Sequence, residues 1–214
     1  MGLNKNIGNE ENVTYLSVIG GNISQKVAAG TPGAVMRVNK KGTEVHEMIH
    51  NNGITGMVVG LVVEESDYGQ QLKVTIKDVD EKFFLFFSVE SKFFDSFASK
   101  IGSADLSKEI TIRPFSFVPK DGDGSKISGV TLTQDEVKLD YYFTEEDAKG
   151  KPFIKKGTPK LTESKWKMFK LAEREFLCEY INELIQEEAP AETSKSEKVE
   201  SVETEEDSSD LPWE

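Results

Sequence analysis

The chain's two histidines lie in His46-Glu47-Met48-Ile49-His50, which matches the H-E-x-x-H signature of zinc peptidases. The signature works on a helix, where residues i and i+4 share a face, so that two imidazoles bind one zinc ion while the glutamate acts on a water. Gly42 and Asn51-Asn52-Gly53 bound the segment too closely for such a helix. On a strand the imidazoles would stand roughly 13 Å apart, too far for one ion. We therefore favour a solvent-exposed strand and rank the zinc peptidase last.

The other residue types form no recognisable catalytic set. Cys178 is the only cysteine, which excludes internal disulfides and suits a reducing cytoplasm. With both histidines on one short segment, no Ser-His-Asp arrangement suggests itself, and no glycine-rich loop is placed to cradle a phosphate. We expect a protein that is not an enzyme and that uses neither a cofactor nor a metal.

Two neighbouring segments combine lysines and aromatic residues with a period of two. In a strand, Lys73 and Lys77 would share one face, and Lys82, Phe84 and Phe86 would share one face of the next strand. A short turn joins the segments, so they should pair as neighbours. Rings flanked by lysines suit single-stranded nucleic acid, because bases offer π faces and phosphates offer charge. The alternative is that another element covers the two rings, since periodicity does not say what covers a face.

A later segment adds a second set of the same residue types. Arg113, Phe115 and Phe117 share one parity, and Pro114 between them predicts a strand edge or a bulge that could expose the rings. Lys120 follows on a loop. The interpretation is that the lysines and arginine of both sets neutralise phosphates while the four phenylalanines stack bases.

The segments that carry these residues have the order strand, strand, strand, helix, strand, strand. That order predicts a mainly β protein with a five-stranded OB barrel, a fold that binds oligonucleotides or oligosaccharides. Helical spacing of Phe93, Phe97 and Ile101 predicts the helix. The strands are predicted over residues 54–66, 71–79, 82–90, 109–118 and 138–143.

The flanking segments are predicted to extend this barrel. Residues 12–19 should form a strand, and residues 34–39 and 43–50 a hairpin, giving an N-terminal β extension. Residues 161–186 should form an amphipathic helix that packs on the barrel or, second, forms a homodimer. Its apolar stripe is Trp166, Phe169, Phe176, Tyr180, Ile181 and Leu184. No stretch of the sequence is apolar and long enough to cross a membrane.

The net charge of −12 is concentrated at the C-terminus. Residues 187–214 hold 11 acidic residues and only Lys195 and Lys198, which gives −9 and leaves −3 for residues 1–186. We therefore divide the chain into a binding domain, residues 1–186, and an acidic tail, residues 187–214, which is expected to be disordered. The tail nevertheless ends in the apolar residues Leu211, Pro212 and Trp213, which predicts a short motif for a protein partner.

The acidic run and the tip formed by Asp207, Asp210, Leu211, Pro212 and Trp213 resemble the C-terminus of single-stranded DNA-binding proteins. Bacterial members end in an Asp-Ile-Pro-Phe-like tip, and phage members carry an acidic tail with a terminal aromatic residue. Here Glu214 follows the aromatic residue, which is a departure. The N-terminal extension and the C-terminal helix are more similar to the phage forms.

The resemblance implies a function for the whole chain. It implies a protein that coats and protects single-stranded DNA in replication or recombination and recruits a polymerase, helicase or recombinase through its tail. It also implies the cytoplasm as the location, that of a host cell if the protein is viral. The alternative within the same fold is an adaptor that holds RNA or protein in the groove.

Overall fold

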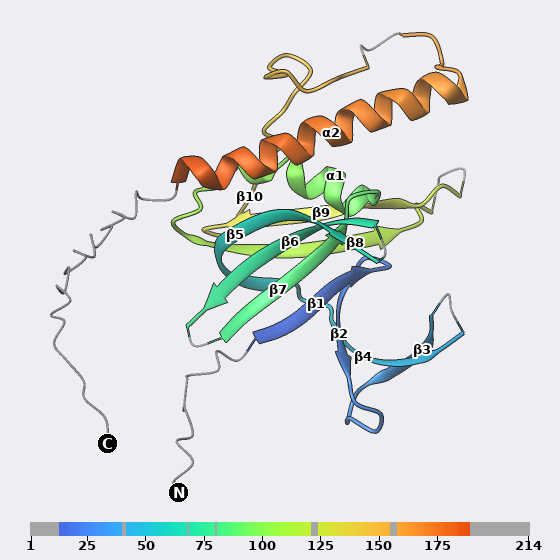
Figure 1. Cartoon of the computed structure of the whole chain (residues 1–214), viewed down its shortest axis with the longest axis vertical. Coiled ribbons are helices and arrows are strands. Elements are labelled where there is room, and N and C mark those ends of the chain that lie inside the picture. Colours follow the sequence, from blue (N-terminus) through green and yellow to red (C-terminus); the bar gives the residue numbers. More distant parts are fainter. Residues whose placement is uncertain are drawn as a thin grey trace, which may run out of the picture.

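The computed structural model describes residues 13–39, 42–67, 69–79, 81–120, 124–154 and 158–188 of the 214-residue chain. The elements are, in order, β1 (Val13–Ile19), β2 (Asn22–Val27), β3 (Val35–Val38), β4 (Glu44–His50), β5 (Ile54–Ser66), β6 (Gly69–Asp78), β7 (Glu81–Ser88), α1 (Lys92–Ala98), the 3₁₀ helix η1 (Ile101–Ser103), β8 (Glu109–Phe117), β9 (Ile127–Gln134), β10 (Val137–Lys138) and α2 (Glu163–Glu188). Figure 1 shows them along the chain. The protein is mainly β, as predicted.

The strands form one ten-stranded, open, mixed sheet with the order β10-β9-β8-β5-β6-β7-β1-β2-β4-β3. The prediction of a closed five-stranded barrel is therefore wrong. Closure would require β7 to pair with β9, but β7 pairs in parallel with β1, with Tyr15 opposite Phe84. The N-terminal extension thus takes the strand edge that a barrel would have used, and the sheet continues through β2, β4 and β3.

Helix α1 provides partners for the part of the β9 edge that β10 leaves unpaired. The backbone N–H of Val130 donates to Ser96 Oγ at 3.0 Å, and its carbonyl accepts from Lys100 Nζ at 2.6 Å. Both partners are buried residues at or just beyond α1. Because buried backbone groups are costly to leave without hydrogen bonds, these side chains replace the missing strand partner.

The core lies between the sheet and the two helices. Period-2 alternation places Leu72, Val74 and Ile76 of β6 and Leu85 and Phe87 of β7 on the inner face, where all are buried. The ring of Phe87 stacks on Phe97 of α1, with centroids 5.1 Å apart. The inner face of the sheet is therefore the one that α1 covers.

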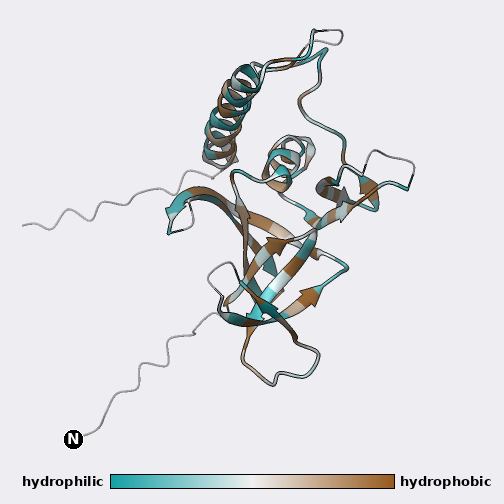
Figure 2. Cartoon of the chain, turned by 90° about the vertical axis from the view of Figure 1, so that its right-hand side faces the viewer, coloured by the Kyte–Doolittle hydropathy of each residue, from teal (hydrophilic) through white to brown (hydrophobic). Residues whose placement is uncertain are grey.

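Helix α2 packs outside α1, as Figure 1 shows. Leu177 and Ile181 are fully buried. Ion pairs add to the contact: a buried one joins Lys151 to Glu173 at 2.7 Å, and the part-buried Lys170 bonds both Glu173 and Asp95 of α1. In Figure 2 hydrophobic and hydrophilic residues alternate along α2, as expected for a helix with one apolar side. Among the described residues no helix has both the length and the apolar character that crossing a membrane requires.

Several predicted elements match closely, and one does not. The strand over residues 54–66, the N-terminal strand and hairpin, and both helices are confirmed. The last predicted strand, residues 138–143, is wrong, because only Val137–Lys138 pair with β9. Tyr142 instead stacks on Tyr180 of α2, and Phe143 meets Phe176 and Tyr180 edge to face. On the side away from β5, β8 pairs with β9, a strand that the sequence analysis did not predict.

Candidate functional site

The outer face of β6, β7 and β1 gathers lysines and aromatic rings. The register places Lys73 opposite Phe86, Thr75 opposite Phe84, and Lys77 opposite Lys82. Phe84 and Phe86 are half-buried, whereas their neighbours Leu85 and Phe87 are buried on the side of α1. We call the set Tyr15, Lys73, Lys77, Lys82, Phe84 and Phe86 the aromatic face.

Tyr15 completes this face from a strand distant in sequence. Its ring lies nearly parallel to that of Phe86, at an interplanar angle of 5° with centroids 6.4 Å apart, and meets the edge of Phe84 at 5.5 Å. Its side chain is 62% exposed. The sequence interpretation missed Tyr15. Alternation in β1 could have predicted that Tyr15 and the apolar Leu16 point to different faces of the strand. Nothing in the local sequence predicts that β1 pairs with β7.

The lysines lie close enough to the rings to act with them. Lys73 Nζ lies 5.6 Å from the centre of the Phe84 ring and Lys82 Nζ lies 5.9 Å from it. Lys73 also forms an ion pair with Glu64 at 2.8 Å. Lys77 and Lys82 are direct cross-strand partners, and like charges in that position repel each other.

The second predicted set lies in another part of the sheet. Arg113, Phe115 and Phe117 lie on the outward parity of β8, where the rings of Phe115 and Phe117 are 6.0 Å apart, and Lys120 follows in the exposed connection. The register separates them from the aromatic rings: β8 pairs with residues 54–57 of β5 through Glu109 to Ile112, so Arg113, Phe115 and Phe117 lie beyond this ladder, whereas Thr75 and Phe84 align with Gly60. The structure thus brings together five of the nine predicted residues, and Tyr15 joins them.

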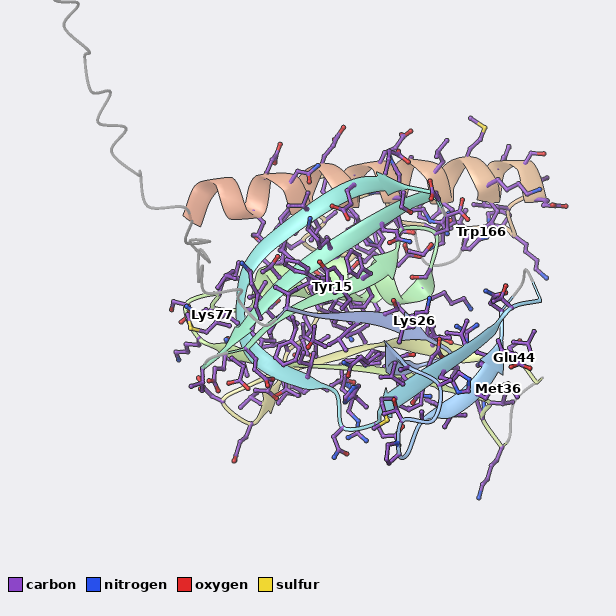
Figure 3. All side chains as sticks on the ribbon, turned by 60° about the horizontal axis from the view of Figure 1, so that its bottom comes forward. Tyr15, Lys26, Met36, Glu44, Lys77 and Trp166 are labelled. Carbon is purple, nitrogen blue, oxygen red and sulfur yellow. The ribbon has the colours of Figure 1, made fainter. Side chains whose placement is uncertain are left out.

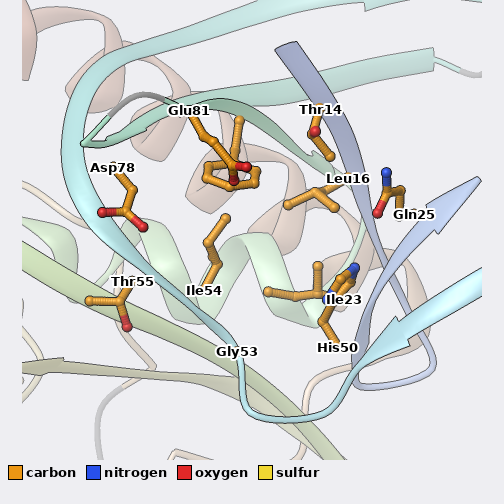
Figure 4. Close-up of a pocket in the computed structure, with 11 residues that line it drawn as sticks. Thr14, Leu16, Ile23, Gln25, His50, Gly53, Ile54, Thr55, Asp78 and Glu81 are labelled. Atoms are coloured by element: carbon orange, nitrogen blue, oxygen red, sulfur yellow. The ribbon is translucent and has the colours of Figure 1, made fainter. Parts of the chain in front are cut away.

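The opposite side of the β6–β7 turn is acidic. A cavity of about 510 Å³ opens there, with Leu16, Ile23 and Phe83 among its apolar lining residues. Figure 4 shows Asp78 and Glu81 at this cavity. The described residues that line it include no lysine or arginine, so it does not suit a phosphate. The two faces of the sheet at the β6–β7 turn therefore differ in charge.

The histidine motif does not form a zinc site in this arrangement. β4 is a strand, as favoured above, and His46 and His50 pair with Val27 and Ile23 of β2. Glu47 accepts hydrogen bonds from Arg37, so it is not placed to act on a water. In the described part of the chain, no group of three or more His, Cys, Asp or Glu side chains could hold a metal ion.

Comparison with known proteins adds no identification. No protein-family model, no curated protein and no solved structure matches the chain. The predicted partner-binding residues Asp207, Asp210, Leu211, Pro212 and Trp213 lie outside the described residues.

Proposed function

We propose that the protein binds single-stranded DNA on the aromatic face and coats and protects exposed strands during replication or recombination. The observation that carries the proposal is the convergence of Tyr15 with Phe84 and Phe86 beside Lys73, Lys77 and Lys82. Large rings left half-buried on a sheet face, on the side away from α1, are available for stacking. Lysines beside them supply charge for phosphates.

The combination favours a single strand over a duplex. In a duplex each base is already stacked between its neighbours, so protein rings on an open sheet face can stack only on unpaired bases. The lysines give a local positive charge, although Lys73 is paired with Glu64 and residues 1–186 together carry −3. The acidic cavity on the other side of the β6–β7 turn repels phosphate, so the electrostatic attraction for a nucleic acid is confined to the aromatic face.

The strand order supports the same proposal. The segment β5-β6-β7-α1-β8-β9, with β8 paired to β5, follows the order of an OB fold up to the point of closure. We describe it as an opened OB-like sheet, and OB folds bind oligonucleotides on the outer face of strands equivalent to β6 and β7. RNA offers the same bases and phosphates, so an RNA-binding adaptor is the second candidate.

The acidic residues 187–214 are proposed to recruit a polymerase, helicase or recombinase, with Leu211 and Trp213 as apolar anchors. The protein would act in the cytoplasm, that of a host cell if it is viral.

One titration tests the proposal. The full chain is mixed with fluorescently labelled oligothymidylate, with the matching oligoribonucleotide and with a duplex of equal length, and anisotropy is measured at several salt concentrations. We expect the DNA single strand to bind most tightly and its affinity to fall with salt. Equal affinity for duplex and single strand would refute the stacking assignment. Tighter binding of the ribo-oligomer would favour the RNA adaptor.

A further inference from the structure

The aromatic face continues past β1 onto the N-terminal extension. One row of cross-strand partners runs from Lys73 through Phe86, Ser17 and Ser24 to Ile49, crossing β6, β7, β1, β2 and β4. Ser17 therefore borders both the aromatic face and the strands beyond it. In Figure 3 Tyr15 lies between Lys77 and Lys26, the latter on β2 of the extension.

A pocket lies where the sheet turns into this extension. Its volume is about 380 Å³, and Ser17, Ile19, Ser24, Lys26, Arg37 and Glu47 contribute to its lining. Ser24 and Glu47 are only 3% and 6% exposed, although they share a face with exposed neighbours. The residues of β2, β3 and β4 thus line the pocket, and Ser24 and Glu47 are its buried members. We call this the N-terminal pocket.

The charges in the N-terminal pocket favour an anion. Arg37 donates through Nε to Glu47 Oε2 at 3.0 Å and through a terminal nitrogen to Oε1. This pair is neutral in sum, and Lys26 adds one positive charge at an exposed position. The two bonds to Glu47 use two of the five N–H groups of the guanidinium, and the pairing fixes its plane. A phosphate near Lys26 would thus meet a net positive charge beside a positioned arginine.

The spacing suits a continuous chain ligand. Leu16 pairs with Gln25 at the end of the β1–β2 ladder, so the next residues on the outer face, Tyr15 and Lys26, are neighbours. From Thr75 to Lys26 the path crosses three strand spacings, roughly 14 Å. A strand that stacks on Phe84 and Tyr15 would reach the N-terminal pocket by extending directly across β1.

We propose that the N-terminal pocket is a second subsite that receives the backbone of the same single strand, with Lys26 and Arg37 as its phosphate ligands. This inference rests on the proposed function. It predicts that the strand length needed for full affinity exceeds what the aromatic face alone can cover. The N-terminal extension then serves to lengthen the binding path in addition to closing the edge of β7.

The test compares Lys26→Ala with unaltered full-length protein on oligothymidylates of about 4 to about 16 nucleotides. Lys26 is exposed, so its removal should leave folding intact. The plot of log affinity against log salt should lose about 0.7 of its slope on the longest oligomers, the value for one phosphate contact on a single strand. The shortest oligomers, held by the aromatic face, should show no change.

Two further variants make the result specific. Lys165→Ala removes the same charge from an exposed position on α2, away from the aromatic face, and should leave every slope unchanged. Lys26→Arg retains the charge and should restore the slope.

The outcomes separate the two proposals. If Phe84→Ala weakens binding and Lys26→Ala changes nothing at any length, the second subsite is refuted and the aromatic face stands. If Lys26→Ala weakens the shortest and longest oligomers equally, Lys26 belongs to the aromatic face and the separate pocket is refuted. If the unaltered protein binds no oligomer, the proposed function itself fails.

Discussion

The rings of Tyr15 in β1 and Phe86 in β7 lie nearly parallel across the parallel strand pair, at an interplanar angle of 5°. The pairing of β1 with β7 has two consequences. It occupies the edge of β7, so β5 to β9 do not close into a barrel, and it brings the ring of Tyr15 beside Phe84 and Phe86. The same strand pairing therefore opens the sheet and completes the aromatic face.

Tyr15→Ala should weaken binding of a single strand by about 1 to 3 kcal/mol, the cost of losing one stacked base. The side chain is largely exposed, so the free energy of unfolding should change little. Oligothymidylate titration beside denaturant unfolding separates the two quantities. Tyr15→Phe keeps the ring and is the control. Unchanged affinity in the alanine variant would remove Tyr15 from the site.

Phe84→Ala should lower the affinity for a single strand and Phe87→Ala should lower the stability of the fold, although both residues lie on β7. Phe84 points to the aromatic face, so its loss should reduce affinity by about 1 to 3 kcal/mol. Phe87 is 1% exposed and stacks on Phe97, so its loss should reduce stability by about 3 to 5 kcal/mol while the folded protein binds normally. Melting curves and titrations on both variants check this. A binding defect confined to Phe87→Ala would reverse the assignment of the two faces.

Local patterns in the sequence predicted most of the strands and the faces of β6 and β7. Leu72, Val74 and Ile76 alternate with Lys73, Thr75 and Lys77, and a short turn forces the next segment to pair with them. These are short-range constraints. For the same reason the sequence could predict that one face of β6 and β7 gathers Lys73, Lys77, Lys82, Phe84 and Phe86.

Long-range pairing was not accessible in the same way. The parallel contact of Tyr15 with Phe84 joins segments almost seventy residues apart, and no turn specifies it. The structure places the second predicted set on another part of the sheet than the first, which the sequence could not show, because parity fixes a face but not the register between distant strands. The segment 138–143 was mistaken for a strand because its aromatic residues serve helix α2 instead.

Ser96→Ala should destabilise the fold by about 1 to 3 kcal/mol, the cost of a buried N–H without a partner. Val130 is fully buried and its N–H donates to Ser96 Oγ, whereas its carbonyl would still accept from Lys100. Ser103→Ala, at an exposed position in η1, is the control and should change stability by less than about 0.5 kcal/mol. Denaturant unfolding measures both. Equal midpoints would show that α1 does not substitute for the missing strand.

The Arg37–Glu47 pair should make the N-terminal extension sensitive to acid. The hydrogen bond from Arg37 holds the pKa of Glu47 below its ordinary value of 4.5, although burial opposes this. The folded pKa is the lower one, so the stabilisation is present above about pH 4.5 and is lost as the pH falls through the folded pKa.

Unfolding at pH 7 and at successively lower pH tests this on two variants. Glu47→Gln should show a smaller loss of stability with acid than the unaltered protein. Glu44→Gln removes the same charge from an exposed position on β4 and should behave like the unaltered protein. An acid response that Glu47→Gln leaves intact would mean that other carboxylates carry it.

Removing residues 189–214 should tighten binding of a single strand, most strongly at low salt. These residues carry nine acidic side chains against Lys195 and Lys198, and they are tethered to a domain whose aromatic face is basic. A tethered anion acts at high effective concentration and is screened as salt rises, so the DNA affinities of the truncated and full chains should converge at high salt.

Changing only Leu211 and Trp213 to alanine keeps the charge and should spare DNA affinity while abolishing capture of a replication or recombination protein. Titrations over a salt series and pull-downs on the three chains measure these effects. Equal DNA affinity of the full and truncated chains at low salt would exclude the competition, and partner capture by the altered tip would exclude the recruitment role.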